Sequence, residues 1–405
     1  MDVRPISGEW RALRPFLVAW GVLLLVLELA GATAARSLSR FFDFRSFYAA
    51  GYLLRTRPVE LYNLAQQRWV QDHLIAPNRT LPFFSPAYEA LMYVPFSLMH
   101  YEAAYLSFLA FNMVLLLAAF LVARGAFSVT LPIWQPRPGL MLPAFFPLLI
   151  GLLQGQTSVL LLLICCATWA ALERGRGGLA GLILAAGLFK FNLILPIALV
   201  LAVWQGRRFI AGFMSGGAAV LGLSALLVGG SGLATLLTLL RAGSLAANQG
   251  ATAQAAIAVF PPQMANLYGL VYALTHALHR PDFTFGVTMV LSAVLVVLCA
   301  WMTRREQRKD VAFSIAMLCG LLVSYHLYVH DLTLLVLPLA LLYRLQHYNE
   351  LMLAMYALPL VLLCFVGVNL FFLLTPLLLM VLWLIWRSQS EDSWDAGVTQ
   401  AAGAL

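Results

Sequence analysis

Long apolar runs separated by short polar breaks dominate the sequence. A helix needs about 20 apolar residues to cross the hydrocarbon core of a bilayer, so these runs predict membrane spans. The predicted spans cover residues 16–34, 103–123, 140–153, 157–172, 178–189, 193–204, 209–228, 283–302, 311–325, 332–342, 351–366 and 370–386. A marginally apolar helix is expected over 263–278. The pattern predicts an all-α, polytopic membrane bundle of about 10–12 spans.

Three polar stretches interrupt this pattern. Residues 36–88 are too polar to cross a bilayer, and within them 52–64 and 64–74 are predicted to form amphipathic helices lying on the membrane. Residues 229–262, rich in Gly, Ala and Gln, form a second predicted outer loop. Residues 388–405 are predicted to be a polar, disordered cytoplasmic tail. Residues 1–387 are therefore interpreted as a single transmembrane domain.

The distribution of basic residues predicts the orientation. Arg4, Arg11 and Arg14 precede the first span and favour a cytoplasmic N-terminus. On the resulting threading the C-terminus is also cytoplasmic and residues 36–88 face outward. The predicted inner loops then hold Arg4, Arg11, Arg14, Arg124, Arg137, Arg174, Arg176, Arg207, Arg208, Arg304, Arg305, Arg308, Lys309, Arg344 and Arg387. Outside the long first loop, the outer side keeps only Lys190, Arg241 and Arg280.

Composition agrees with a membrane protein. The chain is 62% hydrophobic and 10% charged, whereas soluble domains carry roughly 25% charged residues. A net charge of +8 would indicate nucleic-acid binding only in a soluble protein. Here the basic residues are expected to set orientation and contact anionic lipid, so membrane lipid is an expected partner and nucleic acid is not. The sequence contains no Walker-type loop, GxGxxG fingerprint or HExxH motif.

The threading places a set of polar residues at one face of the membrane. They are Asp43, Arg45, Tyr48, Gln154, Gln156, Lys190, Asn192, Asn266, His326, His330 and Asp331. Charged groups at a span are costly, so each needs a partner or a function. Asp43 lies among phenylalanines, which would raise its basicity and suit a general base. As an alternative, Asp43 caps the helix that follows it.

The remaining candidates also have two interpretations each. Lys190 interrupts an apolar run, and it either binds a phosphate or extends to the interface. His330 and Asp331 form either an orienting or phosphate-contacting pair or a helix cap. Gln154-Gly155-Gln156 binds sugar hydroxyls or forms a tight turn. Glu28 in the first span faces either a cavity or an interface.

A histidine pair raises the question of a metal. His326 and His330 are four residues apart, which would suit a metal if the turn were helical, but no third ligand has suitable spacing. We therefore expect no metal site.

Several short motifs in fixed order resemble glycosyltransferase family 87. They are Asp43-Phe44-Arg45-Ser46-Phe47-Tyr48-Ala49-Ala50-Gly51, Leu61-Tyr62, Pro82-Phe83-Phe84-Ser85-Pro86, Pro95-Phe96-Ser97-Leu98, Gly155-Gln156, Ala180-Gly181-Leu182, Phe189-Lys190, Asn266-Leu267 and His330-Asp331-Leu332. The family often has Tyr-Pro-Pro where this chain has Ser85-Pro86-Ala87, and Lys-Pro at Lys190-Phe191. These departures bear on acceptor specificity more than on the fold.

The resemblance implies a GT-C-like fold whose first outer loop covers an outward cavity, in a bacterial plasma (inner) membrane protein of the cell envelope. It implies a polyprenyl-phosphate sugar donor, mannose above other hexoses, a lipid or glycan acceptor, and inversion at the anomeric carbon. Asp43 would be the base; Lys190, Arg45 and His330 would bind the donor phosphate. Tyr48, Gln154, Gln156, Asn266 and Asp331 would bind sugar or acceptor. No cofactor is expected, and a divalent metal is optional. A transporter or flippase of a lipid-linked sugar is the alternative, and a non-catalytic membrane scaffold is a third.

Overall fold

A computed structural model describes residues 43–77, 80–123, 126, 145–246, 260–343, 349–365 and 368–402. The predicted span 16–34 with Glu28, and all of the predicted inner loop 124–139 except residue 126, lie outside these residues. The described residues form helices and no strands. Five of their helices are long and apolar enough to cross a membrane: Tyr101–Val122, Leu188–Gln205, Arg207–Arg241, Pro281–Arg305 and Asn369–Ser388. The prediction of an all-α polytopic membrane bundle is confirmed.

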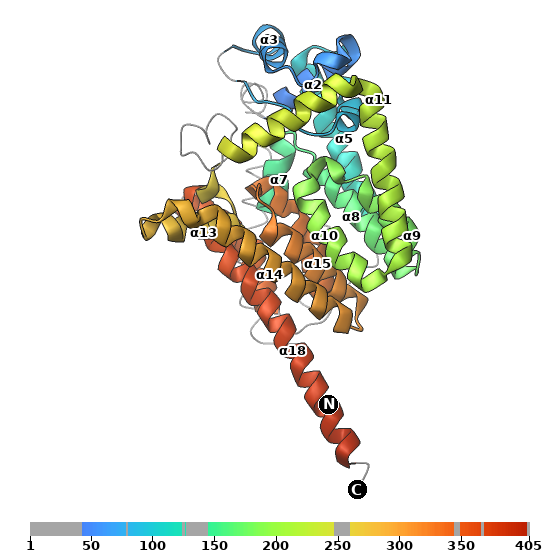
Figure 1. The fold of residues 1–405 in the computed structure, drawn as a ribbon, viewed down its shortest axis with the longest axis vertical. Helices are drawn as coiled ribbons and strands as arrows, with labels where there is room; N and C mark the ends of the chain where they lie inside the picture. The colour runs from blue at the N-terminus through green and yellow to red at the C-terminus, as the bar shows by residue number, and fades with distance from the viewer. Residues whose placement is uncertain are drawn as a thin grey trace, which may run out of the picture.

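The bundle consists of helices that run roughly along one direction (Figure 1). Its described elements are α5 (Tyr101–Val122), α7 (Phe146–Leu153), α8 (Ser158–Glu173), α9 (Gly177–Ala185), α10 (Phe191–Gln205), α11 (Arg207–Ala246), α13 (Leu267–Ala277), α14 (Thr284–Arg305), α15 (Lys309–Val323), α16 (Val336–Tyr343), α17 (Asn349–Phe365) and α18 (Leu374–Ala402). The core between them contains mainly leucine, isoleucine, valine and phenylalanine side chains from α8, α10 and α15.

Glycines allow α9 and α11 to pack closely. A Cβ added at Gly181 would collide with the carbonyl of Phe209, and one added at Gly212 would collide with the carbonyl of Gly178. Helices that pack within a bilayer gain mainly from such close van der Waals contact. Without side chains at Gly181 and Gly212, the backbones of α9 and α11 come into direct contact.

Basic turns gather at one end of the bundle. The turns between α8 and α9, between α10 and α11, and between α14 and α15 lie at the same end (Figure 1). The ammonium of Lys309 donates to the carbonyl of Glu173 at 3.2 Å, which joins the first and the last of these turns. α18 extends away from the bundle past this end (Figure 1).

The other end is covered by the polar segment that follows residue 42. It contains α2 (Phe44–Thr56), η2 (Pro58–Glu60), α3 (Leu64–Leu74), α4 (Ala87–Ala90), η3 (Leu91–Tyr93) and η4 (Phe96–Leu98). α3 has the predicted bounds, and Asn63 caps it by accepting from the backbone amides of Ala65 and Gln66. The preceding helix begins at Phe44 rather than at residue 52. Phe44 is fully buried and stacks on Phe108 at a centroid distance of 4.9 Å, and this tertiary burial extends the helix backward.

Two further elements differ from the sequence prediction. α11 bends at Gly229, where φ is 69°, and continues as a helix to Ala246 through the first part of the predicted loop 229–262. After the bend it runs across the same end as α2 and α3 (Figure 1), and Leu236 packs in the apolar cluster that includes Tyr62. α18 continues through the predicted tail as far as Ala402.

Candidate active site

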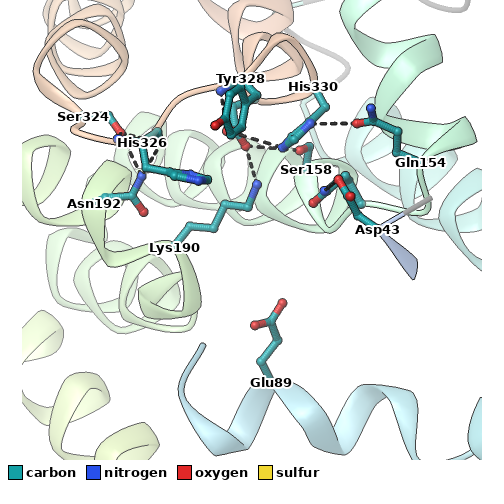
Figure 2. A network of polar contacts seen from close by, with 12 residues as sticks. Asp43, Glu89, Gln154, Ser158, Lys190, Asn192, Ser324, His326, Tyr328 and His330 are labelled. Carbon is teal, nitrogen blue, oxygen red and sulfur yellow. Dashed lines mark hydrogen bonds and ion pairs between the residues drawn. The ribbon is translucent and has the colours of Figure 1, made fainter. Parts of the chain in front are cut away.

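Polar side chains from several distant segments meet near the α2 end of the bundle. The cluster contains Asp43, Gln154, Ser158, Lys190, Asn192, Ser324, His326, Tyr328 and His330 (Figure 2). It also contains Gln156, which contacts Asp43, and Asp331, which contacts Lys190. Most of these residues lie at the starts of α2, α8, α10 and η9 (Val329–Leu335), or in the loops just before them. The opposite ends of α8 and α10 form the basic turns, so the cluster and the basic residues lie at opposite ends.

The loop between α7 and α8 fixes Asp43. The backbone amide of Phe44 donates to the carbonyl of Gln154 at 3.1 Å. The side-chain amide of Gln156 donates to Asp43 Oδ2 at 2.5 Å. Asp43 precedes α2, but its side chain makes no capping hydrogen bond. Its carboxylate therefore belongs to the polar cluster rather than to the helix end.

Gly155 makes this arrangement possible. Its φ of +64° lies in the left-handed region, and an added Cβ would lie 2.7 Å from Cβ of Phe44. A side chain at this position would be strained and would push α2 away. Gln154-Gly155-Gln156 thus forms a tight turn and also directs two side-chain amides into the cluster.

Lys190 and Asp331 form a buried ion pair. The Lys190 ammonium contacts Asp331 Oδ1, and the two side chains are 16% and 2% exposed. Asp331 Oδ2 accepts from the backbone amide of Tyr328 at 3.1 Å, and the Ser158 hydroxyl lies 3.5 Å from Oδ1. Asp331 thereby closes the first turn of η9 and orients the lysine. An ammonium has three donors, so Lys190 retains capacity for a ligand.

His330 joins the two halves of the cluster. Its Nδ1 lies 2.8 Å from Oε1 of Gln154, and its Nε2 lies 3.6 Å from Oδ2 of Asp331. Gln154 and Gln156 belong to one turn, so Asp43, His330, Asp331 and Lys190 are parts of one connected arrangement (Figure 2).

Asn192 and Asn266 support the turn before η9. Asn192 Nδ2 donates to Ser324 Oγ at 2.8 Å and to the carbonyl of His326 at 2.7 Å. Asn266 Nδ2 donates to the carbonyl of Ser324 at 2.6 Å, while its Oδ1 accepts from the amide of Gly269 and caps α13. In these contacts Asn266 holds the turn and does not contact the carboxylates.

Two other predicted site residues contact different parts of the protein. The fully buried guanidinium of Arg45 donates to Gln71 Oε1 at 3.0 Å and to the carbonyl of Ala76 at 2.8 Å. The hydroxyl of Tyr48 donates to the carbonyl of Met99 at 2.8 Å. These contacts anchor α2 to α3 and to the segment before α5.

Sequence reasoning missed Ser158 and Glu89. Glu89 on α4 is 4% exposed and points toward the cluster (Figure 2). Burial raises the pKa of Glu89 to about 7, although the Ser85 hydroxyl and the charge of Lys190 act in the opposite direction. The signal was available, because Glu89 begins an otherwise apolar stretch and a charge in such a place is costly. Ser158 carries no comparable signal.

Among the described residues, no group of three or more His, Cys, Asp or Glu side chains is arranged to hold a metal ion. The cluster offers two carboxylates, one ammonium, two imidazoles, three side-chain amides and three hydroxyls.

Fold and site together define a polytopic membrane protein with a charged, hydrogen-bonded centre near one end of its bundle. Residues 83–338 match the family model of glycosyltransferase family 87, which is more than half of the chain. The chain belongs to glycosyltransferase family 87 and is a membrane glycosyltransferase that uses a sugar donor and an acceptor. No curated protein and no solved structure matches it. The matched region includes Gln154, Lys190 and Asp331, while Asp43 precedes it.

Proposed function

We propose that the protein transfers a hexose from a polyprenyl-phosphate donor to a lipid or glycan acceptor, and that this hexose is mannose. The observation that supports this most is the meeting of Asp43 and the Lys190–Asp331 pair through one turn, Gln154 to Gln156. A lipid-phosphate donor also fits a sequence that has no nucleotide-binding motif.

The proposed reaction is a direct displacement that inverts the anomeric carbon. An acceptor hydroxyl attacks this carbon while Asp43 takes the hydroxyl proton. The bond from the anomeric carbon to the phosphate oxygen breaks, and the polyprenyl phosphate leaves as a dianion. Gln156 holds the Asp43 carboxylate in place through its amide.

Lys190 would stabilise the charge that develops on the leaving phosphate. Its ammonium is held by Asp331, which is itself fixed by the amide of Tyr328. Preorganised donors of this kind lower the barrier because they need not reorient during the reaction. His330 would add a second contact from the same turn, and Gln154 holds its ring. Because the leaving group is a monophosphate, this chemistry does not require a divalent metal.

The distribution of charge supports an outward-facing site. Arginines and lysines at short loops favour the cytoplasmic side, and in this protein the turns α8–α9, α10–α11 and α14–α15, which hold most of them, lie at the end opposite to the cluster. We therefore infer that Asp43 faces the outside of a bacterial plasma membrane. Fusion reporters at the α10–α11 turn and beside Asp43 test this inference, because a result placing both on one side would contradict it.

The function is tested with purified protein, radiolabelled polyprenyl-phosphate mannose and a panel of lipid and glycan acceptors. We expect sugar transfer that is lost in Asp43→Asn and retained in Glu173→Gln, which changes an exposed carboxylate at the basic end. A transporter would instead move the donor with its sugar–phosphate bond intact. Full transfer by both Asp43→Asn and Lys190→Ala would contradict the assigned site.

A further inference from the structure

Glu89 is a second carboxylate at the site that the proposed mechanism does not use. It lies on α4, the short helix that begins directly after Pro86, and its side chain is directed toward the cluster that contains Lys190 and Asp43 (Figure 2). It approaches from a different element than His330 and Asp331 do, so it faces them across the site.

The carboxylate of Glu89 has only part of its hydrogen-bonding capacity filled. Tyr93 donates its hydroxyl to Oε1 at 3.1 Å. Oε2 is buried and has no hydrogen-bond partner among the described residues, and no ion pair to Glu89 occurs in that part of the chain. A buried carboxylate oxygen can accept more than one donor, and leaving it without one is costly.

A second buried polar group lies nearby. The Ser85 and Thr157 hydroxyls lie near enough to Glu89 to lower its pKa as hydrogen-bond donors. Neither makes a hydrogen bond of full geometry to Oε2, and Thr157 Oγ1 is buried without such a bond within the described residues. Thr157 follows Gln156, the residue that holds Asp43. Buried polar groups in native proteins are nearly always fully hydrogen-bonded, and a ligand with hydroxyl groups would complete the bonding of both Oε2 and this hydroxyl.

The other carboxylates of the site are already engaged. Asp331 binds Lys190 and the amide of Tyr328, and Asp43 accepts from Gln156. Oε2 of Glu89, which lacks a hydrogen bond of full geometry among the described residues, is therefore able to accept from a sugar hydroxyl. The charge of Lys190 acts on Glu89, and a sugar joined to a phosphate on Lys190 would lie within the region between them.

We propose that Glu89 binds hydroxyl groups of the donor sugar and thereby selects which hexose is transferred. This inference rests on the proposed polyprenyl-phosphate donor. Glu89 accepts hydrogen bonds from the hydroxyls through Oε2, and Thr157 adds a hydroxyl contact beside it. Glu89 is a binding residue in this account, and Asp43 remains the base.

The test compares Glu89→Gln, Tyr93→Phe and the control Glu173→Gln in transfer from polyprenyl-phosphate mannose. Glu89→Gln keeps the shape of the side chain and an oxygen for Tyr93. We expect it to lower kcat/KM for the donor about 10- to 100-fold, as expected for a lost hydrogen bond to a charged group, with no loss of thermal stability. Glu173→Gln should change kcat/KM less than about threefold, because it removes no contact at the site. Tyr93→Phe removes the hydroxyl that donates to Glu89 Oε1, so it should lower kcat/KM by less than Glu89→Gln does.

Donors that lack single hydroxyl groups add a readout that a structural role would not change. A donor that lacks the hydroxyl bound by Glu89 should lower kcat/KM in the wild type. The same donor should leave kcat/KM of Glu89→Gln almost unchanged, because that variant has already lost the contact. Wild-type efficiency in Glu89→Gln would overturn the inference. So would a loss of activity that follows a loss of thermal stability, or one that is the same for every deoxy donor.

Failure of the inference can be separated from failure of the proposed function. Suppose that the wild type transfers mannose, Asp43→Asn does not, and Glu89→Gln does so at the wild-type rate. This result would overturn only the role of Glu89. Wild-type protein that neither transfers from nor is thermally stabilised by polyprenyl-phosphate mannose would overturn the proposed donor and the role of Glu89 together.

Discussion

The Lys190–Asp331 pair allows a catalytic role to be separated from a structural one. Both side chains are mostly buried, with exposures of 16% and 2%. Removing one member of a buried ion pair leaves an uncompensated charge and costs about 3–5 kcal/mol, whereas replacing both members is often close to neutral. Lys190→Met strands the almost fully buried Asp331, so it should cost that amount in free energy of unfolding. Asp331→Asn should cost less, because Lys190 keeps some contact with solvent.

The double variant Lys190→Met/Asp331→Asn should then recover most of the lost stability. It should not recover transfer, because the phosphate contact is still missing. Losing one such contact in the transition state costs about 2.7–4 kcal/mol, which is a 100- to 1000-fold loss in rate. If Lys190 acts on the donor, the double variant therefore recovers its free energy of unfolding but not its transfer rate.

Unfolding in a detergent–denaturant titration measures the stability of the four proteins, and transfer from the labelled donor measures their activity. The wild type and the three variants form one double-mutant cycle for each quantity. If the double variant regained transfer together with stability, Lys190 would serve only to neutralise Asp331. That result would refute the phosphate-binding role.

Three further perturbations test other parts of the site. Gly155→Ala should lower transfer at least 10-fold with the fold retained, because its positive φ and the contact with Phe44 would displace Asp43; circular dichroism and transfer rates check this. The raised pKa of Glu89, about 7 against 4.5, favours protonation of the folded state. The free energy of unfolding should therefore fall as pH rises from about 4.5 to 7, by roughly 3 kcal/mol in total. In unfolding titrations at several pH values, Glu89→Gln should lack this fall. The same dependence of the unfolding free energy on pH in wild type and variant would contradict the raised pKa. Treatment with EDTA should leave the transfer rate within about twofold, because Lys190 meets the phosphate charge; a loss restored by Mg²⁺ would show that a metal is needed.

Hydropathy and charge predicted the class of fold because a membrane imposes strong constraints on sequence. Spans must be apolar, and basic residues at short loops predict orientation. The local pattern of apolar and polar residues is enough to predict α5 and α3. The glycines that let α9 and α11 come close are likewise visible in the sequence. The start of α2 did not, because it depends on the burial of Phe44 against Phe108, a residue far along the chain.

The site could be predicted only in part for the same reason. Asp43, Lys190 and Asp331 stood out because charges beside apolar runs are costly. Their pairing could not be read from sequence, since Lys190 and Asp331 are separated by 141 positions. Arg45 has the same signal as Asp43, but its guanidinium donates to Gln71 and to the carbonyl of Ala76, which are not part of the cluster. Residue type and position could not distinguish these two outcomes.

If Asp43 is the base for sugar transfer from a polyprenyl-phosphate donor, its carboxylate is needed for the chemical step itself. Single-turnover transfer by the purified wild type and by Asp43→Asn at saturating donor and acceptor measures this step directly. We expect the wild type to release polyprenyl phosphate and form a glycosylated acceptor, and Asp43→Asn to lose at least 100-fold in rate with donor binding retained. Transfer by Asp43→Asn at the wild-type rate, or movement of intact donor by the wild type without cleavage, would contradict it.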